Sequence, residues 1–277
     1  MPTRTFSIET FESSSNRRGN ILNYGPPKTG KTTALYTLIK LGLRPIWVHD
    51  FDRGVDPFIR FAKKYGLIED PKNDIKIFRY DPKGGDKIGQ GITRPAGQGR
   101  DLYLDFCSNI NGLYDHVDPN TGSWKEGLPY GTVPAVSVVD SASALQEIIL
   151  DYVLAMLGHN LGDPKTDARN DFGRQMGKSV EIIKSMLSLP MISIWIAHES
   201  IERNELTGEI RNDPHFTGKL APVIGREFGT VLYSTTRTVN GQIEYVWQCQ
   251  PQGYIKTAGS RFKDVKGMIP QDYGLVI

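Results

Sequence analysis

Short apolar segments alternate with stretches of helical periodicity along roughly the first 200 residues of the chain. A short continuous apolar run is typical of a strand buried on both faces, and apolar residues at every third and fourth position are typical of a helix packed on a sheet. The pattern predicts strands at residues 20–24, 44–50, 75–80, 133–140 and 191–198. It predicts helices at about 31–42, 56–65, 101–113, 142–157 and 171–189. Such alternation predicts an α/β fold with a mainly parallel central sheet flanked by helices.

The pattern changes after Leu220. Residues 230–237 and 243–248 alternate between apolar and polar side chains, as antiparallel strands do. Asn240-Gly241 lies between them and is a strong signal for a tight hairpin turn. The chain is therefore expected to add a C-terminal antiparallel hairpin to the parallel sheet.

The length of 277 residues suits one large α/β domain. We expect a polar N-terminal arm at residues 1–19 and a single core at 20–277. Two stretches without periodicity, at about 81–100 and 115–132, predict long loops inserted into that core.

Composition and charge argue against a membrane or secreted protein but say little else about the class of protein. Hydrophobic residues make up 39% of the chain, and no apolar run approaches the length of a membrane span or opens a signal peptide. The net charge of +2 does not indicate a nucleic-acid binder, so any such contact depends on local patches. Cys107 and Cys249 fit two reduced thiols better than a disulfide. We expect a soluble cytoplasmic protein with no membrane partner.

The residues from Gly25 to Thr32 form the strongest motif in the sequence. They fit the pattern Gly-x-x-x-x-Gly-Lys-[Ser/Thr] at every fixed position, between a predicted strand and a predicted helix. The glycines let backbone N–H groups close around a polyphosphate, Lys31 would reach the β- and γ-phosphates, and the Thr32 hydroxyl would ligate Mg²⁺. The motif predicts binding of ATP with Mg²⁺. The expected nucleotide-binding residues are Gly25, Pro26, Pro27, Lys28, Thr29, Gly30, Lys31, Thr32 and Thr33.

Asp140 ends the apolar run at 133–140, where an unpaired carboxylate is costly unless it meets a cation. We expect it to join Thr32 as a ligand of Mg²⁺, and a role as a helix N-cap is the alternative. Ring ATPases of the AAA+ type follow this acid with a glutamate that activates water. Here Ser141 follows, so the water-activating carboxylate must lie elsewhere.

Residues 50–57 read Asp-Phe-Asp-Arg-Gly-Val-Asp-Pro and resemble the Asp-Ala-Glu-x-x-x-Asp-Pro segment of RecA-like ATPases. Asp52 stands in place of the catalytic glutamate. Residues 138–145 resemble the second nucleotide motif of that family, and residues 194–198 resemble its strand that ends in a polar sensor, here His198. The resemblance implies a P-loop NTPase fold of the RecA-like type. It implies a catalytic set of Lys31, Asp52, Asp140 and His198.

The chain most resembles the compact phage-type RecA-core ATPases associated with recombination and single-strand annealing, in part through residues 216–222 and 260–263. This resemblance implies a homo-oligomer, ring or filament, whose ATP site lies between subunits. Arg261 or Lys263 is the candidate cation contributed by the neighbouring subunit. The resemblance also implies a DNA-binding loop at 199–218, for which a solvated hairpin is the alternative.

These observations favour a Mg²⁺-dependent ATPase that acts with single-stranded DNA, and with a recombination or replication protein, in the host cytoplasm if phage-encoded. One alternative is a slow or non-catalytic nucleotide-binding assembly factor, because Asp52 replaces the glutamate. A small-molecule kinase and an isolated helicase motor core also remain open, since the phosphate-binding motif serves both.

Overall fold

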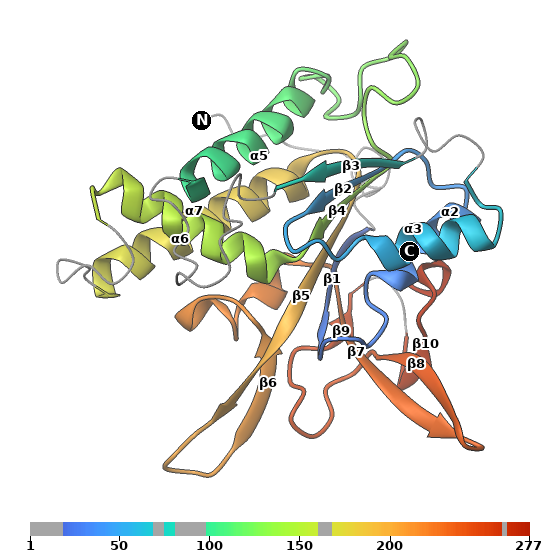
Figure 1. Ribbon diagram of the computed structural model, residues 1–277, viewed down its shortest axis with the longest axis vertical. Helices are drawn as coiled ribbons and strands as arrows, with labels where there is room; N and C mark the ends of the chain where they lie inside the picture. Colours follow the sequence, from blue (N-terminus) through green and yellow to red (C-terminus); the bar gives the residue numbers. More distant parts are fainter. Residues whose placement is uncertain (1–18, 69–74, 81–97, 160–167, 262–264) are drawn as a thin grey trace, which may run out of the picture.

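A mixed sheet, most of whose strands are parallel, forms the centre of the molecule (Figure 1). The computed structural model describes residues 19–68, 75–80, 98–159, 168–261 and 265–277. In sheet order the strands are β10 (Met268–Pro270), β8 (Gln242–Gln248), β7 (Thr230–Val239), β1 (Asn20–Gly25), β5 (Ile192–Arg203), β4 (Val136–Asp140), β2 (Ile46–Asp50) and β3 (Ile75–Arg79). The run from β7 to β3 is parallel throughout, and β8 and β10 are antiparallel.

Two shorter strands lie beside this main order. β6 (Ile210–Pro214) pairs antiparallel with the outer part of β5, and the two form a long hairpin that projects from the sheet (Figure 1). β9 (Gly259–Ser260) pairs antiparallel with the start of β7.

Helices cover both faces of the sheet, and each face has its own hydrophobic core. One face packs on α5 (Gln98–Tyr114), α6 (Ala142–Met156) and α7 (Ala168–Ser188). The other packs on the 3₁₀ turn η1 (Thr33–Leu35), α2 (Tyr36–Lys40), α3 (Asp56–Lys64) and the 3₁₀ turn η4 (Tyr273–Leu275). Because side chains alternate along a strand, Leu22 and Tyr24 of β1 enter the first core while Ile21 enters the second. Further 3₁₀ turns are η2 (Gly218–Leu220) and η3 (Ile224–Glu227).

The predicted α/β class, the mainly parallel sheet and the C-terminal antiparallel hairpin are confirmed. Asn240 and Gly241 have φ angles of 50° and 77°, the positive values that a tight hairpin turn of type I′ requires. Several boundaries differ from those predicted. The helix expected from residue 31 begins as a 3₁₀ turn at Thr33, the strand expected from residue 133 begins at Val136, and β5 runs on to Arg203, where the sequence predicted a loop.

The predicted loops and arm are described only in part. Residues 81–97 lie outside the described residues, and α5 already begins at Gln98, inside the predicted loop. Residues 115–132 are irregular apart from a bridge between Val117 and Trp124. Of the expected arm, residues 1–18 lie outside the described residues. Cys107 and Cys249 are free thiols. In the described ranges, no helix has the length and apolarity needed to cross a membrane.

Candidate nucleotide-binding site

The carboxyl ends of β1, β4 and β2 lie at one edge of the sheet, and β5 runs between β1 and β4 and continues past that edge. Gly25 at the end of β1 pairs with His198 in β5, and Asp50 at the end of β2 pairs with Asp140 at the end of β4. Because these strands are parallel, the segments that follow them leave from the same edge. Sheet topology therefore brings the phosphate-loop motif together with the acids and the histidine that the sequence singled out.

The phosphate loop, residues 25–33, begins with a backbone that only glycine fits. Gly25 has a φ of +149°, and a Cβ atom there would lie 2.3 Å from the carbonyl oxygen of Ser234. Lys28 and Gly30 also have positive φ angles, of 63° and 83°. Within the described part of the chain, no main-chain amide from Lys28 to Thr33 donates a hydrogen bond to another residue. A turn of successive amides without protein acceptors suits an anion such as a phosphate.

Lys31 carries its charge inside this loop. Its Nζ donates hydrogen bonds to the carbonyl oxygens of Gly25, at 2.9 Å, and Pro26, at 2.6 Å. Burial lowers the pKa of Lys31 to about 8, although the nearby carboxylate of Asp140 acts in the opposite direction. The ammonium group is thus surrounded by loop oxygens, at the place where the motif predicts phosphate oxygens.

Thr32 and Asp140 are joined by a short hydrogen bond. The Thr32 Oγ1 hydroxyl donates to Oδ2 of Asp140 at 2.6 Å, and the Asp140 residue is only 3% exposed. Burial, together with the neighbouring carboxylate of Asp52, raises the pKa of Asp140 to about 7. A hydroxyl and a carboxylate oxygen are hard ligands of the kind that Mg²⁺ takes.

This pair fits the metal that the motif implies. In the described residues, no group of three or more His, Cys, Asp or Glu side chains is arranged to hold a metal ion. Thr32 and Asp140 would therefore supply two oxygens, and the phosphates of a nucleotide and water would supply the rest, as is usual for Mg²⁺.

Ser141, and not Asp140, caps the helix that follows β4. Its hydroxyl accepts a hydrogen bond from the main-chain N–H of Ala144 at 3.2 Å, at the N-terminus of α6. The alternative interpretation of Asp140 as an N-cap is therefore wrong. The Asp140 carboxylate is left to face the phosphate loop.

Asp52 and His198 form a second polar pair at the same edge. Nε2 of His198 lies 3.6 Å from Oδ2 of Asp52, whose side chain is 28% exposed. Burial acts to raise the pKa of Asp52, but hydrogen bonds from His198 and Ser141 outweigh it and hold that pKa below its usual value. A Cβ atom on Gly54 would lie 2.8 Å from Asp52 Oδ1 and 3.6 Å from Asp140 Oδ2, so the two carboxylates border the same small space.

Two residues that the sequence analysis did not assign hold this pair in place. Asp50 is buried and fixes the turn after β2, because its carboxylate accepts hydrogen bonds from Gly54 N at 3.0 Å and Arg79 Nε at 3.3 Å. The Ser143 hydroxyl accepts a hydrogen bond from the main-chain N–H of His198 at 3.0 Å. Asp50 does lie inside the 50–57 motif, but nothing in the pattern separates its role from that of Asp52.

The C-terminal segment closes one side of the phosphate loop. Nε2 of Gln271 donates to the carbonyl oxygens of Thr29, at 2.9 Å, and Val246, at 3.2 Å. A Cβ atom on Gly30 would lie 3.1 Å from the ring of Tyr245 in β8. Neither Gln271 nor Tyr245 belongs to a motif, and no local signal could have assigned them to this site.

Arg261, one of the candidate neighbour cations, is not part of this site within one chain. Arg261 follows β9 and bonds Gly229 and Arg226 through main-chain and side-chain nitrogens, near the start of β7. It therefore lies at the opposite edge of the sheet from the phosphate loop. Lys263 lies outside the described residues. Their expected contribution to a neighbouring subunit stays a prediction.

The segment expected to bind DNA is the β5–β6 hairpin. Residues 199–214 contain five acidic and two basic side chains, which gives a net charge of −3. The acidic side chains are Glu199, Glu202, Glu205, Glu209 and Asp213, and the basic ones are Arg203 and Arg211. This net charge does not favour contact with a phosphate backbone. The DNA-binding role expected of residues 199–218 stays a prediction.

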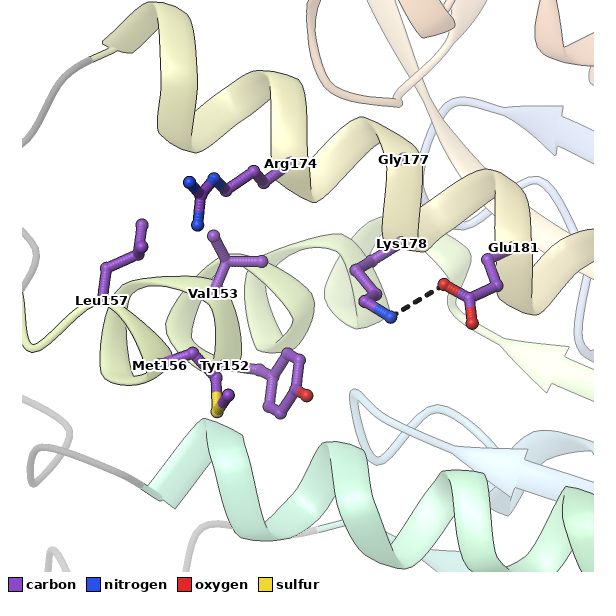
Figure 2. Close-up of a pocket in the computed structure, with 8 residues that line it drawn as sticks. All are labelled: Tyr152, Val153, Met156, Leu157, Arg174, Gly177, Lys178 and Glu181. Carbon is purple, nitrogen blue, oxygen red and sulfur yellow. Dashed lines mark hydrogen bonds and ion pairs between the residues drawn. The ribbon is translucent and has the colours of Figure 1, made fainter.

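A pocket of about 460 Å³ lies apart from this edge of the sheet, between α6 and α7 (Figure 2). It is lined by Tyr152, Val153, Met156, Leu157, Arg174, Gly177, Lys178 and Glu181. Lys178 and Glu181 form an ion pair of 2.8 Å at its wall. The lining residues of α6 come from its C-terminal end, whereas Asp140 precedes its N-terminus. At about 1.5 Å per residue the two ends are roughly 20 Å apart, so the pocket is not part of the candidate site.

Comparison with protein-family models gives no match, and comparison with curated proteins gives no similar sequence. The residues at this edge bring together the amides of the phosphate loop, the Lys31 ammonium group, the Thr32–Asp140 oxygen pair and the charged carboxylate of Asp52.

Proposed function

We propose that this chain is a Mg²⁺-dependent ATP-binding and ATP-hydrolysing protein of the RecA-like P-loop type. The observation that carries the proposal is the 2.6 Å hydrogen bond between Thr32 and Asp140. It joins the last fixed residue of the phosphate-binding motif to the buried acid of another strand. A buried carboxylate with a raised pKa has a clear use there as a ligand of a cation.

The phosphate loop would hold the nucleotide. Its amides from Lys28 to Thr33 and the Lys31 ammonium would bind the β- and γ-phosphates, and Gly25 and Gly30 let the backbone take that shape. Thr32 and Asp140 would hold Mg²⁺, which, when bound, neutralises charge that develops on the phosphates.

Asp52 would act as the general base, and His198 would position it. The pKa of Asp52 lies below its usual value, so its carboxylate is charged at neutral pH and can accept a proton from an attacking water. His198 lies 3.6 Å away and comes from the strand that pairs with the phosphate-loop strand. A conformational change in the phosphate loop would therefore be transmitted to His198 through the pairing of β1 with β5.

The wider setting of the proposal comes from the resemblance. It includes single-stranded DNA, a recombination or replication partner, and a homo-oligomer in which Arg261 or Lys263 completes a neighbour's site. It also includes a place in the host cytoplasm, without a membrane partner.

A second candidate is a slow or non-catalytic nucleotide-binding assembly factor. It is favoured by Asp52 itself, because aspartate has a shorter reach than glutamate and a lowered pKa makes a carboxylate a weaker base.

ATP hydrolysis with and without single-stranded DNA tests the proposal. The parent should release phosphate faster with DNA, and Lys31→Ala should lose about 100-fold or more of that turnover. Lys184→Ala is the matched control, because Lys184 is an exposed lysine of α7 outside the candidate site and its loss should leave turnover within about twofold. Turnover that ignores DNA but needs a nucleoside acceptor would overturn the proposal. Salt-dependent DNA binding without hydrolysis would favour the second candidate.

A further inference from the structure

An aromatic and basic surface lies on α2 and α3, on the solvent side of these helices. The ring of Tyr36 stacks on that of Tyr65 with centroids 5.8 Å apart, and the ring of Phe61 lies 5.8 Å from that of Tyr36 and 6.1 Å from that of Tyr65. Lys40 and Lys64 place their ammonium groups 4.6 Å from the Tyr36 centroid and 5.7 Å from the Tyr65 centroid. We call these five residues the α2–α3 surface.

This surface combines exposed rings with positive charge. Phe61 is 37% exposed and Tyr65 is 51% exposed, and aromatic side chains gathered in this way are typical of interaction surfaces. Residues 36–40 and 56–64 carry four basic side chains, Lys40, Arg60, Lys63 and Lys64, and one acidic side chain, Asp56, for a net charge of +3. The single acid pairs with Arg79 at 3.7 Å.

The tip of the β5–β6 hairpin has the opposite character. Leu206 is 97% exposed and Ile201 is 63% exposed, in a hairpin whose net charge is −3. The tip is ordered, because Asn204 Oδ1 accepts hydrogen bonds from the main-chain N–H groups of Leu206, at 2.9 Å, and Thr207, at 3.1 Å. An apolar side chain is thus held out on an acidic arm.

We propose that the β5–β6 hairpin of one copy of this chain docks onto the α2–α3 surface of a second copy. Leu206 meets the aromatic rings, while Glu202 and Glu205 face Lys40 and Lys64. The two surfaces match in their apolar groups and have opposite charges. This complementarity selects a second copy as the partner and fixes the orientation in which it docks.

The hairpin and the α2–α3 surface lie on different sides of the molecule, so this contact is head-to-tail. Figure 1 shows the hairpin projecting at the lower left, away from α2 and α3 at the right. The two surfaces of one copy cannot meet each other, so each copy uses a different surface toward each neighbour. Such contacts either close into a ring or continue as a filament. The contact does not involve the phosphate loop and does not depend on nucleotide.

Charge reversal tests the contact, with self-association measured by sedimentation in the absence of nucleotide. Lys40→Glu with Lys64→Glu should weaken self-association about tenfold or more, and Glu202→Lys with Glu205→Lys should do the same. All four changes in one chain restore the complementarity and should recover most of the affinity. Lys178→Glu with Lys184→Glu makes the same charge change on α7 and should leave self-association unaltered.

Three results would overturn the proposal. The parent could stay monomeric at every concentration, or the fourfold variant could associate no better than either double variant. Alternatively, Tyr65→Ala could weaken binding of single-stranded DNA while self-association is unchanged, which would make nucleic acid the occupant of this surface. Because no nucleotide is present, failure of the ATPase proposal would leave the sedimentation result intact, and the reverse also holds.

Discussion

Thr32 Oγ1 lies 2.6 Å from Asp140 Oδ2, although 108 residues separate the two in the chain. Their strands are not neighbours, because β5 lies between β1 and β4. At about 4.8 Å per strand, the phosphate loop crosses roughly 10 Å to bring its last fixed residue to the acid. His198, which pairs with Gly25, lies on this intervening strand β5.

Removing either partner of this pair should impair the use of Mg²⁺. Asp140→Asn is expected to lower turnover about 100-fold, and Thr32→Ala to raise the Mg²⁺ concentration for half-maximal turnover about tenfold. Phosphate release over a Mg²⁺ titration measures both. Thr121→Ala, at an exposed threonine of the 115–132 loop, is the matched control. Unchanged turnover in a folded Asp140→Asn protein would mean that the metal ligand is misassigned.

Asp52 should affect the chemical step more than nucleotide binding. We expect Asp52→Asn to lower kcat about 100-fold while the Kd for ATP stays within about twofold, because a general base contributes only to proton transfer. Asp52→Glu restores the longer acid of the resembling family and should retain activity. Asp56→Asn, at the first residue of α3, is the control. A large change in the Kd for ATP would assign Asp52 to binding instead.

The free energy of unfolding of the protein should depend on pH through the titration of Asp140. Burial raises the pKa of Asp140 to about 7, while the unfolded chain titrates near 3.9. Between these values the native state holds a proton that the unfolded state has lost, so this group's contribution to stability is greatest below pH 4 and falls as the pH rises to 7.

Asp140→Asn removes this dependence. The free energy of unfolding of the variant, relative to the parent, should therefore be higher at pH 8 than at pH 5 by roughly 2 kcal/mol. Urea unfolding without Mg²⁺ at both pH values measures it. Added Mg²⁺ at pH 8 should stabilise the parent and not the variant. A difference that is the same at both pH values would contradict the assignment.

Gly25 should tolerate no side chain. Gly25→Ala places a Cβ atom 2.3 Å from the Ser234 carbonyl oxygen, at a φ of +149°, and should destabilise the protein by about 2–4 kcal/mol. Gly112→Ala in α5 meets no atom within 4 Å and should stabilise by about 0.5–1 kcal/mol. Thermal unfolding compares the two, and equal effects would show that the close approach relaxes at no cost.

The parallel core could be predicted because its strands are buried on both faces and read as apolar runs. Asp140 was found at a strand end for the same reason, since a charged residue ends the run at 133–140. The 50–57 and 194–198 segments could be placed at the site because parallel strands bring their carboxyl ends to one edge.

Three features of the structure could not be predicted from the sequence: strand β6, the support of the phosphate loop by Gln271, and the residue that caps α6. Each depends on contacts or side-chain directions that sequence spacing does not show. β6 is formed by backbone hydrogen bonds to the part of β5 that extends beyond the sheet. Residues 210–214 show no alternation of apolar and polar side chains, so the sequence gives no sign of a strand there. Gln271 supports the phosphate loop through a single side-chain amide, and nothing in its neighbourhood marks it. The choice of Ser141 over Asp140 as the N-cap depends on side-chain direction, which sequence spacing does not give.

The bond from Gln271 to Thr29 spans 242 positions of the chain, and Tyr273, two residues further on, donates its main-chain N–H to Thr37 in the helix after the loop. During synthesis the phosphate loop is therefore made early, and the residues that brace it leave the ribosome much later. A nascent chain that stops short of Gln271 has the full motif but not the supported loop. The ability to bind nucleotide should thus appear late in synthesis, once the C-terminal residues have packed against the phosphate loop.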